Sequence, residues 1–232
     1  MKHAVDTVAL APTFDLAGID RLLTTTKSVS RRLDLDRPVP LDLVLECIRI
    51  ASHAPMGGNR EAARWMVISD AETKREIAEI YASVGRPHIA AKRADVEPGS
   101  RGERILTSGA YLVDHLHEVP VLVLALRLGR SDGGRGDDVR VGDDPQSFFG
   151  SVIPAVWNFQ LAARARGLGS RYTTFTTRRQ VEMAALLGIP DDVTQVALLP
   201  VAYHRGGDFR PAPRLPVEEV TFLDRWGRPP PR

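Results

Sequence analysis

The stretch Val119-Pro120-Val121-Leu122-Val123-Leu124-Ala125-Leu126 decides the fold class of this chain. Its apolar residues follow one another without alternation, which is typical of a central strand covered on both faces. Apolar patterns of helical period lie on either side of it, at 41–54 and at 148–166. Strands therefore alternate with helices, and we expect a mixed α and β protein with layers of sheet and helix.

The same reading along the chain predicts the remaining elements. We expect helices at 15–24, 41–54, 70–84, 103–117, 148–166 and 177–188. We expect strands at 65–68, 119–126, 170–175 and 195–203, and one more extended segment at 217–226. Asp70 is the expected N-cap of its helix, and Thr177 with Gln180 matches a capping box. Neither helical nor strand periodicity continues through 86–101 and 129–145. These segments are rich in Pro, Gly and charge, and they are the two candidate lids.

The composition excludes several classes of protein. The chain has 232 residues, with 31 Lys and Arg against 29 Asp and Glu, 43% hydrophobic and 26% charged residues. These values are ordinary for a folded globular protein, and a net charge of +2 argues against nucleic acid as a partner. The longest apolar run, 119–126, is far shorter than the roughly 20 residues of a membrane helix, so we expect no membrane span.

We expect a cytoplasmic protein with one main domain. The lone Cys47 cannot form an intrachain disulfide and suits a reducing compartment. Asp6 interrupts the apolar run at 1–12, so this end does not match a signal peptide and is expected to be poorly ordered. The predicted organisation is an N-terminal extension with a short helix at 1–24, a domain at 25–216, and a C-terminal strand or arm at 217–232.

The common catalytic and metal-binding motifs are missing. The chain has no GxGxxG, no GxxxxGK[ST], no HExxH and no GxSxG. His115 and His117 could share one face of a strand as metal ligands, but no third ligand lies near them in the sequence. We therefore expect no metal site and nominate no catalytic acid or base.

Three polar or Gly-rich clusters lie at the boundaries of elements, where loops on a rigid scaffold carry function. Residues 27–32 hold several cations and two hydroxyls, which suit a phosphate or form a solvated basic turn. In 54–59 a Pro ends the helix, and two glycines either let backbone N–H groups approach a flat ligand or only stop the helix. Residues 206–214 form a rigid turn that presents Arg214 before the last segment.

These clusters, in their order and spacing, resemble the FMN-dependent nitroreductase family. The resemblance spans about 25–226 and includes Gly150 through Gly169 and the closing segments 199–203 and 214–220. It implies an α+β sandwich with a central, mostly antiparallel sheet flanked by helices. It also implies a homodimer with an exchanged C-terminal arm and two FMN sites, each built from both subunits.

The resemblance assigns roles to residues. Lys27, Ser28 and Arg214 would hold the FMN phosphate, Asn59 the polar edge of the ring, and Tyr172 to Thr174 would contact the ring from the other side. The expected FMN-binding residues are Lys27, Ser28, Ser30, Pro55, Met56, Gly57, Asn59, Tyr172, Thr173, Thr174 and Arg214.

Three positions depart from the family pattern. Ser30 stands where the family usually has Arg or Lys near the pyrimidine end of the ring, and Arg31 is a candidate to replace that cation. Glu61 stands where a Gln is common, and Met56 where a small polar residue is common. A lost cation and an added carboxylate would both make flavin reduction harder.

The implied activity is an FMN-dependent NAD(P)H oxidoreductase that reduces nitroaromatic, quinone or related conjugated small molecules by ping-pong transfer through flavin N5. NADPH or NADH would be a transient donor. The alternatives are a specialised relative, such as a dehalogenase or a flavin-processing enzyme, and a catalytically silent flavin-binding protein. A structural dimer without cofactor remains a third possibility and predicts a colourless protein.

Overall fold

The computed structural model describes residues 14–131 and 144–230. The chain divides into two compact units, one formed by residues 1–26 with 208–232 and the other by residues 27–207. The smaller unit holds helix α1 (Leu16–Thr25) and the short helix α8 (Val217–Val220). The larger unit holds every described strand.

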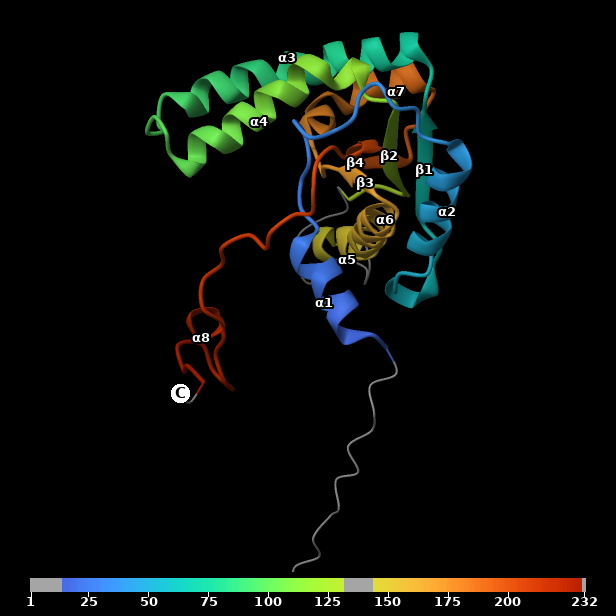
Figure 1. Cartoon of the computed structure of the whole chain (residues 1–232). Helices are drawn as coiled ribbons and strands as arrows, with labels where there is room; N and C mark the ends of the chain where they lie inside the picture. Colours follow the sequence, from blue (N-terminus) through green and yellow to red (C-terminus); the bar gives the residue numbers. More distant parts are fainter. Residues whose placement is uncertain (1–13, 132–143, 231–232) are drawn as a thin grey trace, which may run out of the picture. The chain divides into compact units, whose positions relative to one another are not determined.

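The larger unit is built on a four-stranded antiparallel sheet in the order β1-β2-β4-β3 (Figure 1). Its strands are β1 (Ala63–Ile68), β2 (Val121–Leu128), β3 (Leu168–Ser170) and β4 (Val193–Tyr203). Its helices are α2 (Leu41–Ala51), α3 (Ala71–Arg93), α4 (Arg101–His115), α5 (Pro145–Gly150), α6 (Ile153–Ala165) and α7 (Gln180–Leu187). Three short 3₁₀ helices are η1 (Gly57–Asn59), η2 (Leu116–Glu118) and η3 (Phe175–Arg179).

The central strands have the burial that their sequence predicts. Residues 121–126 of β2 are all buried, so side chains on both faces of the strand are covered. On one face Val123 and Leu199 of β4 pack with Cys47 of α2 and Phe159 of α6 in the main core. The predicted antiparallel α+β architecture is confirmed. Among the described residues no helix is both long and apolar enough to cross a bilayer.

The sequence predicts an irregular lid after residue 84, but the chain there is helical up to Arg93. Helix α3 begins at its predicted cap, where the Asp70 carboxylate accepts from the Thr73 N–H at 2.8 Å, but it continues through Pro87 to Arg93. Only residues 94–100 separate it from α4. The two helices pack along each other, and burial of Ile89 and Val113 stabilises a segment whose own sequence is poor in helix signals. Residues 132–143 of the second candidate lid lie outside the described residues, as do residues 1–13.

Three local predictions are wrong for identifiable reasons. The single helix predicted at 148–166 is two helices, because Pro154 occupies the first turn of α6 and so begins a helix. The Thr177 hydroxyl does not cap α7; it donates to the Thr174 carbonyl at 2.7 Å inside η3. Strand β3 ends at Ser170, and only an isolated bridge joins Thr173 to Leu198.

The expected C-terminal strand does not form within the described single chain. Residues Val217–Val220 form one helical turn, and no described residue beyond Tyr203 lies in a strand. Pro216 precedes this turn, and Glu218 and Glu219 lie in it, where carboxylates favour a helix N-terminus. A strand needs a hydrogen-bonding neighbour, and within the described chain this segment has none.

Candidate functional site

One cavity in the larger unit gathers residues from three separate segments of the chain. Its volume is about 310 Å³, at the lower end of the range for small-molecule sites. The residues that line it are Lys27, Ser28, Ile153, Trp157, Gln160 and Tyr172. Lys27, Ser28 and Tyr172 were expected at a common site, and the structure brings these three together.

The backbone of the Lys27–Ser28 segment is held against strand β3. The Val29 N–H donates to the Ser170 carbonyl at 2.9 Å, and the Val29 side chain is buried. Gly169 allows this approach, because a Cβ at that position would lie 3.1 Å from the Val29 side chain. Lys27 and Ser28 stay exposed on the outer side of this contact.

Helix α6 supplies the other wall of the cavity. Ile153, Trp157 and Gln160 are four and three residues apart and therefore lie on one face of the helix. Ile153 and Trp157 are 44% and 40% exposed, which is unusual for large apolar side chains. None of these three residues is predicted as a site residue from the sequence, although their helical spacing is a signal that could have identified them.

The Gln160 side chain is the most buried polar group of the cavity wall. It is only 7% exposed. Its amide makes no hydrogen bond with any other residue in the described part of the chain. Buried amides are normally hydrogen-bonded, so an amide of this kind that faces a cavity is available to a ligand.

The Tyr172 to Thr174 segment has three different environments. Tyr172 is half-buried at the cavity, and burial raises the pKa of its phenol, so the hydroxyl stays protonated at neutral pH. Thr173 is buried, its hydroxyl lies 2.9 Å from that of Tyr81, and its backbone exchanges two hydrogen bonds with Leu198. Thr174 is exposed, and its carbonyl accepts from Thr177. The Thr173 side chain is thus occupied by the core.

The Ser30 side chain lies behind the cavity wall and not on it. It is 3% exposed, and its hydroxyl accepts a hydrogen bond from Arg171 Nη1 at 3.0 Å. Arg31, the candidate to replace the family's cation, is exposed. The guanidinium next to Ser30 is therefore that of Arg171.

The Gly-rich loop lies next to the start of α6 but does not line the cavity. Gly58 and Asn59 have positive φ angles of 61° and 52°, and a Cβ on Gly57 would lie 3.1 Å from the Ser151 hydroxyl. None of the four loop residues expected at the site lines the cavity with Lys27; these are Pro55, Met56, Gly57 and Asn59. Glu61 is exposed beside this loop.

Arg214 belongs to the smaller unit. Its side chain is exposed, and its guanidinium donates to the Pro213 carbonyl at 3.0 Å.

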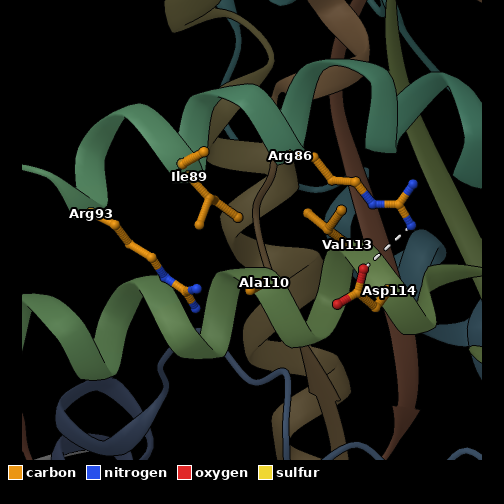
Figure 2. A pocket seen from close by; sticks show the side chains of 7 residues that line it. Arg86, Ile89, Arg93, Ala110, Val113 and Asp114 are labelled. Atoms are coloured by element: carbon orange, nitrogen blue, oxygen red, sulfur yellow. Dashed lines mark hydrogen bonds and ion pairs between the residues drawn. The ribbon is translucent and has the colours of Figure 1, made fainter.

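A second cavity, of about 270 Å³, lies between α3 and α4 (Figure 2). Arg86 and Asp114 point toward each other across it, with Nη2 and Oδ1 3.3 Å apart, and Ile89 and Val113 form its apolar floor. This cavity contains none of the expected FMN-binding residues, although Arg86, Ile89 and Arg93 belong to the first candidate lid. Its facing charges already pair with each other.

The predicted absence of a metal site is not contradicted by the described residues. No group of three or more His, Cys, Asp or Glu side chains among residues 14–131 and 144–230 is placed to hold an ion. His115 Nδ1 lies 2.7 Å from Glu118 Oε1, so this histidine is engaged in a local pair.

Comparison with known proteins identifies the fold. At 24% identity, the chain is similar to the crystal structure of an oxidised iodotyrosine deiodinase bound to FMN and 3-iodo-L-tyrosine. The TM-score is 0.62, with 88% of this chain and 97% of the other covered. A BluB-like flavoprotein from Clostridium difficile 630 is 19% identical with a TM-score of 0.63, over 89% and 99% of the two chains.

Sequence comparison finds the same kind of relative as the structural comparison. The iodotyrosine deiodinase of Nematostella vectensis is 23% identical over 188 residues, which are 80% of this chain and 68% of the relative. The signature of the Nitroreductase family matches residues 23–203, which include the Lys27–Ser28 segment, the Gly-rich loop and the whole sheet. The chain therefore belongs to the Nitroreductase family.

Proposed function

We propose that this chain binds FMN and uses it as an NAD(P)H oxidoreductase for a conjugated small molecule. The single observation that carries the proposal is the cavity that joins Lys27, Ser28 and Tyr172. The sequence nominates these residues for FMN, and they come from segments almost 150 positions apart. A phosphate suits a lysine and a hydroxyl, and an aromatic ring suits the apolar side chains beside them.

The residues present fit one end of FMN. A lysine cation, a serine hydroxyl and the unpartnered Gln160 amide offer polar contacts, while Ile153 and Trp157 offer apolar ones. The cavity of about 310 Å³ takes the phosphate end, and the ring would extend to residues outside it. The Gly-rich loop is our candidate for those contacts.

We further propose a homodimer, in which the partner supplies this loop. In one chain, Pro55, Met56, Gly57 and Asn59 do not line the cavity. Large apolar side chains are exposed on the two helices that flank the region, with Leu41 and Leu45 on α2 and Ile153 and Trp157 on α6. Large apolar side chains exposed on two helices that contact each other are typical of an interface.

The protein's own contribution to the reaction would be binding and exclusion of water. When bound, FMN supplies the two-electron redox chemistry. Lys27 and Arg214 would neutralise the charge of its phosphate, Ser28 would donate a hydrogen bond to it, and Trp157 with Ile153 would keep water from the site. The Tyr172 phenol stays protonated and is available as a hydrogen-bond donor. We assign no acid or base to the chain.

The first test is the visible absorption of the purified protein, followed by anaerobic addition of NADPH and then of NADH. A flavin spectrum that bleaches supports the oxidoreductase and identifies the donor. A spectrum that persists favours the flavin-binding protein without this activity. A colourless protein that FMN does not reconstitute would remove the cofactor from the proposal.

Two variants test the site and the assembly. Arg214→Ala should weaken FMN binding by about 1.5–3 kcal/mol, the scale of a hydrogen bond to a charged group. Unchanged FMN retention on dialysis would exclude Arg214. A chain that ends at Arg214 should give a weaker dimer in sedimentation equilibrium if the last residues form an arm, and an unchanged dissociation constant would exclude the arm.

A second candidate function is reductive dehalogenation. One sequence relative and one structural relative are iodotyrosine deiodinases. In this reaction an aryl C–I bond is replaced by C–H, with two electrons and one proton consumed and iodide released. Iodide release from 3-iodo-L-tyrosine under anaerobic conditions, with dithionite or NADPH as the electron donor, would distinguish it from reduction of a quinone or nitroaromatic compound.

A further inference from the structure

We propose that Gln160 is a flavin-recognition residue that hydrogen-bonds the ribityl hydroxyls of FMN. The proposal rests on the proposed function, because it needs FMN in the cavity. It adds a residue that the sequence motifs did not contain and a specific part of the ligand for that residue to recognise.

The burial of Gln160 is the first step of the argument. Its side chain is 7% exposed and has no hydrogen-bonding partner among the described residues, yet it lines the cavity with Lys27 and Ser28. The amide atoms of Gln160 are not among the polar atoms that are closed off from solvent, so the amide reaches the cavity. It is therefore open to hydrogen bonds from a ligand there.

The chemistry of the amide selects the part of the ligand. A phosphate only accepts hydrogen bonds, and Lys27 and Ser28 already provide donors for it. An amide has both a donor and an acceptor end, and each ribityl hydroxyl can also donate and accept. The ribityl chain is bonded directly to the phosphate, so a phosphate at Lys27 and Ser28 carries the hydroxyls toward the neighbouring wall. That wall is the α6 face with Trp157 and Gln160.

The test compares three ligands on the full-length protein by fluorescence titration. Lumiflavin has the ring alone, riboflavin adds the ribityl chain, and FMN adds the phosphate. Gln160→Met has nearly the same volume but no hydrogen-bonding group. It should raise the dissociation constants of FMN and riboflavin by about tenfold and leave that of lumiflavin unchanged.

A second readout separates this role from a structural one. Gln160→Met should leave the thermal midpoint of the protein without flavin nearly unchanged, because the amide makes no hydrogen bond within the described part of the chain. It should also reduce the additional stabilisation that FMN provides. Gln160→Glu should weaken FMN more than riboflavin, since its carboxylate would face the phosphate.

A matched control is Gln195→Met. Gln195 is also buried, but its Nε2 donates to the Gln180 carbonyl at 2.7 Å and it does not line the cavity. It should leave all three dissociation constants unchanged.

The remaining outcomes contradict the proposal in different ways. Equal weakening of all three flavins by Gln160→Met would place the amide at the ring, and weakening of FMN alone would place it at the phosphate. No change for any ligand would exclude a contact. If the wild-type protein binds neither FMN nor riboflavin, the proposed function itself fails, which is a separate result.

Discussion

Arg171 donates a 3.0 Å hydrogen bond from its Nη1 to the hydroxyl of Ser30, across 141 positions of the sequence. Ser30 is buried, and the Arg171 guanidinium is half-buried beside it. In the family pattern a basic residue is usual at the position of Ser30. The structure thus has a cation at this place, but the cation comes from the segment after β3.

This pair leads to a charge-exchange prediction. Ser30→Arg alone should destabilise the protein, because it buries a second guanidinium next to Arg171. The double variant Ser30→Arg with Arg171→Ser restores one cation and should recover stability. We expect a coupling free energy of about 0.5–3 kcal/mol in urea denaturation. Additive effects of the two substitutions would show that the two positions do not share one cation site.

The Tyr81 and Thr173 hydroxyls form a second pair that can be tested. Both are buried and lie 2.9 Å apart. Tyr81→Phe leaves the Thr173 hydroxyl without this partner and should cost about 1–3 kcal/mol of unfolding free energy. Tyr81→Phe combined with Thr173→Val removes both polar groups and should cost less than the sum of the single changes. Equal costs for the sum and the double variant would show that the hydrogen bond contributes little.

At Gly85 we expect substitution by Ala to lower the stability of the protein, whereas in most helix interiors it raises it. Ala is normally favoured over Gly in a helix interior, by about 1 kcal/mol. At Gly85, however, a Cβ would lie 2.7 Å from Val113 and 3.0 Å from Phe175. Gly85→Ala should therefore destabilise the protein by about 1–3 kcal/mol through overpacking.

A control for Gly85 is available at the end of α5. A Cβ on Gly150 meets no described atom within 4 Å. Gly150→Ala should be neutral or slightly stabilising in the same urea titration. A Gly85→Ala variant as stable as the wild type would mean that α3 and α4 can move apart at little cost.

The ion pair between Glu46 and Arg166 predicts acid sensitivity. Glu46 Oε1 lies 2.7 Å from Arg166 Nη2, and this hydrogen bond, with the attraction of the two charges, lowers the pKa of the carboxyl below its ordinary value of 4.5. A carboxyl with a lowered folded-state pKa stabilises the protein above its unfolded-state pKa. That contribution is lost as the pH falls from about 4.5 through the folded-state pKa.

The measurement is the urea midpoint at several pH values between 6 and 3. Glu46→Gln should be less stable than the wild type at pH 6 and should lose less stability on acidification. Glu76→Gln changes an exposed carboxylate on α3 and should retain the wild-type pH dependence. A Glu46→Gln profile parallel to the wild type would show that this pair does not contribute to acid sensitivity.

The sequence alone determined the class of fold, because burial periodicity is a local property. The unbroken apolar run of β2 required cover on both faces, and Asp70 and Gly188 marked helix ends that the structure contains. The resemblance to the family nominated Lys27, Ser28 and Tyr172, which share one cavity. The helix ends and the buried strand depended on residues close together in the chain.

Only the tertiary structure decided the features that depend on distant contacts. Residues 86–93 are helical because α3 packs along α4, although their own sequence reads as a loop. The cation beside Ser30 comes from Arg171, and the exposed face of α6 brings Gln160 to the cavity. The reason is physical: burial and hydrogen bonding between segments add free energy that local propensity does not contain, and here they determine which polar groups are left for a ligand.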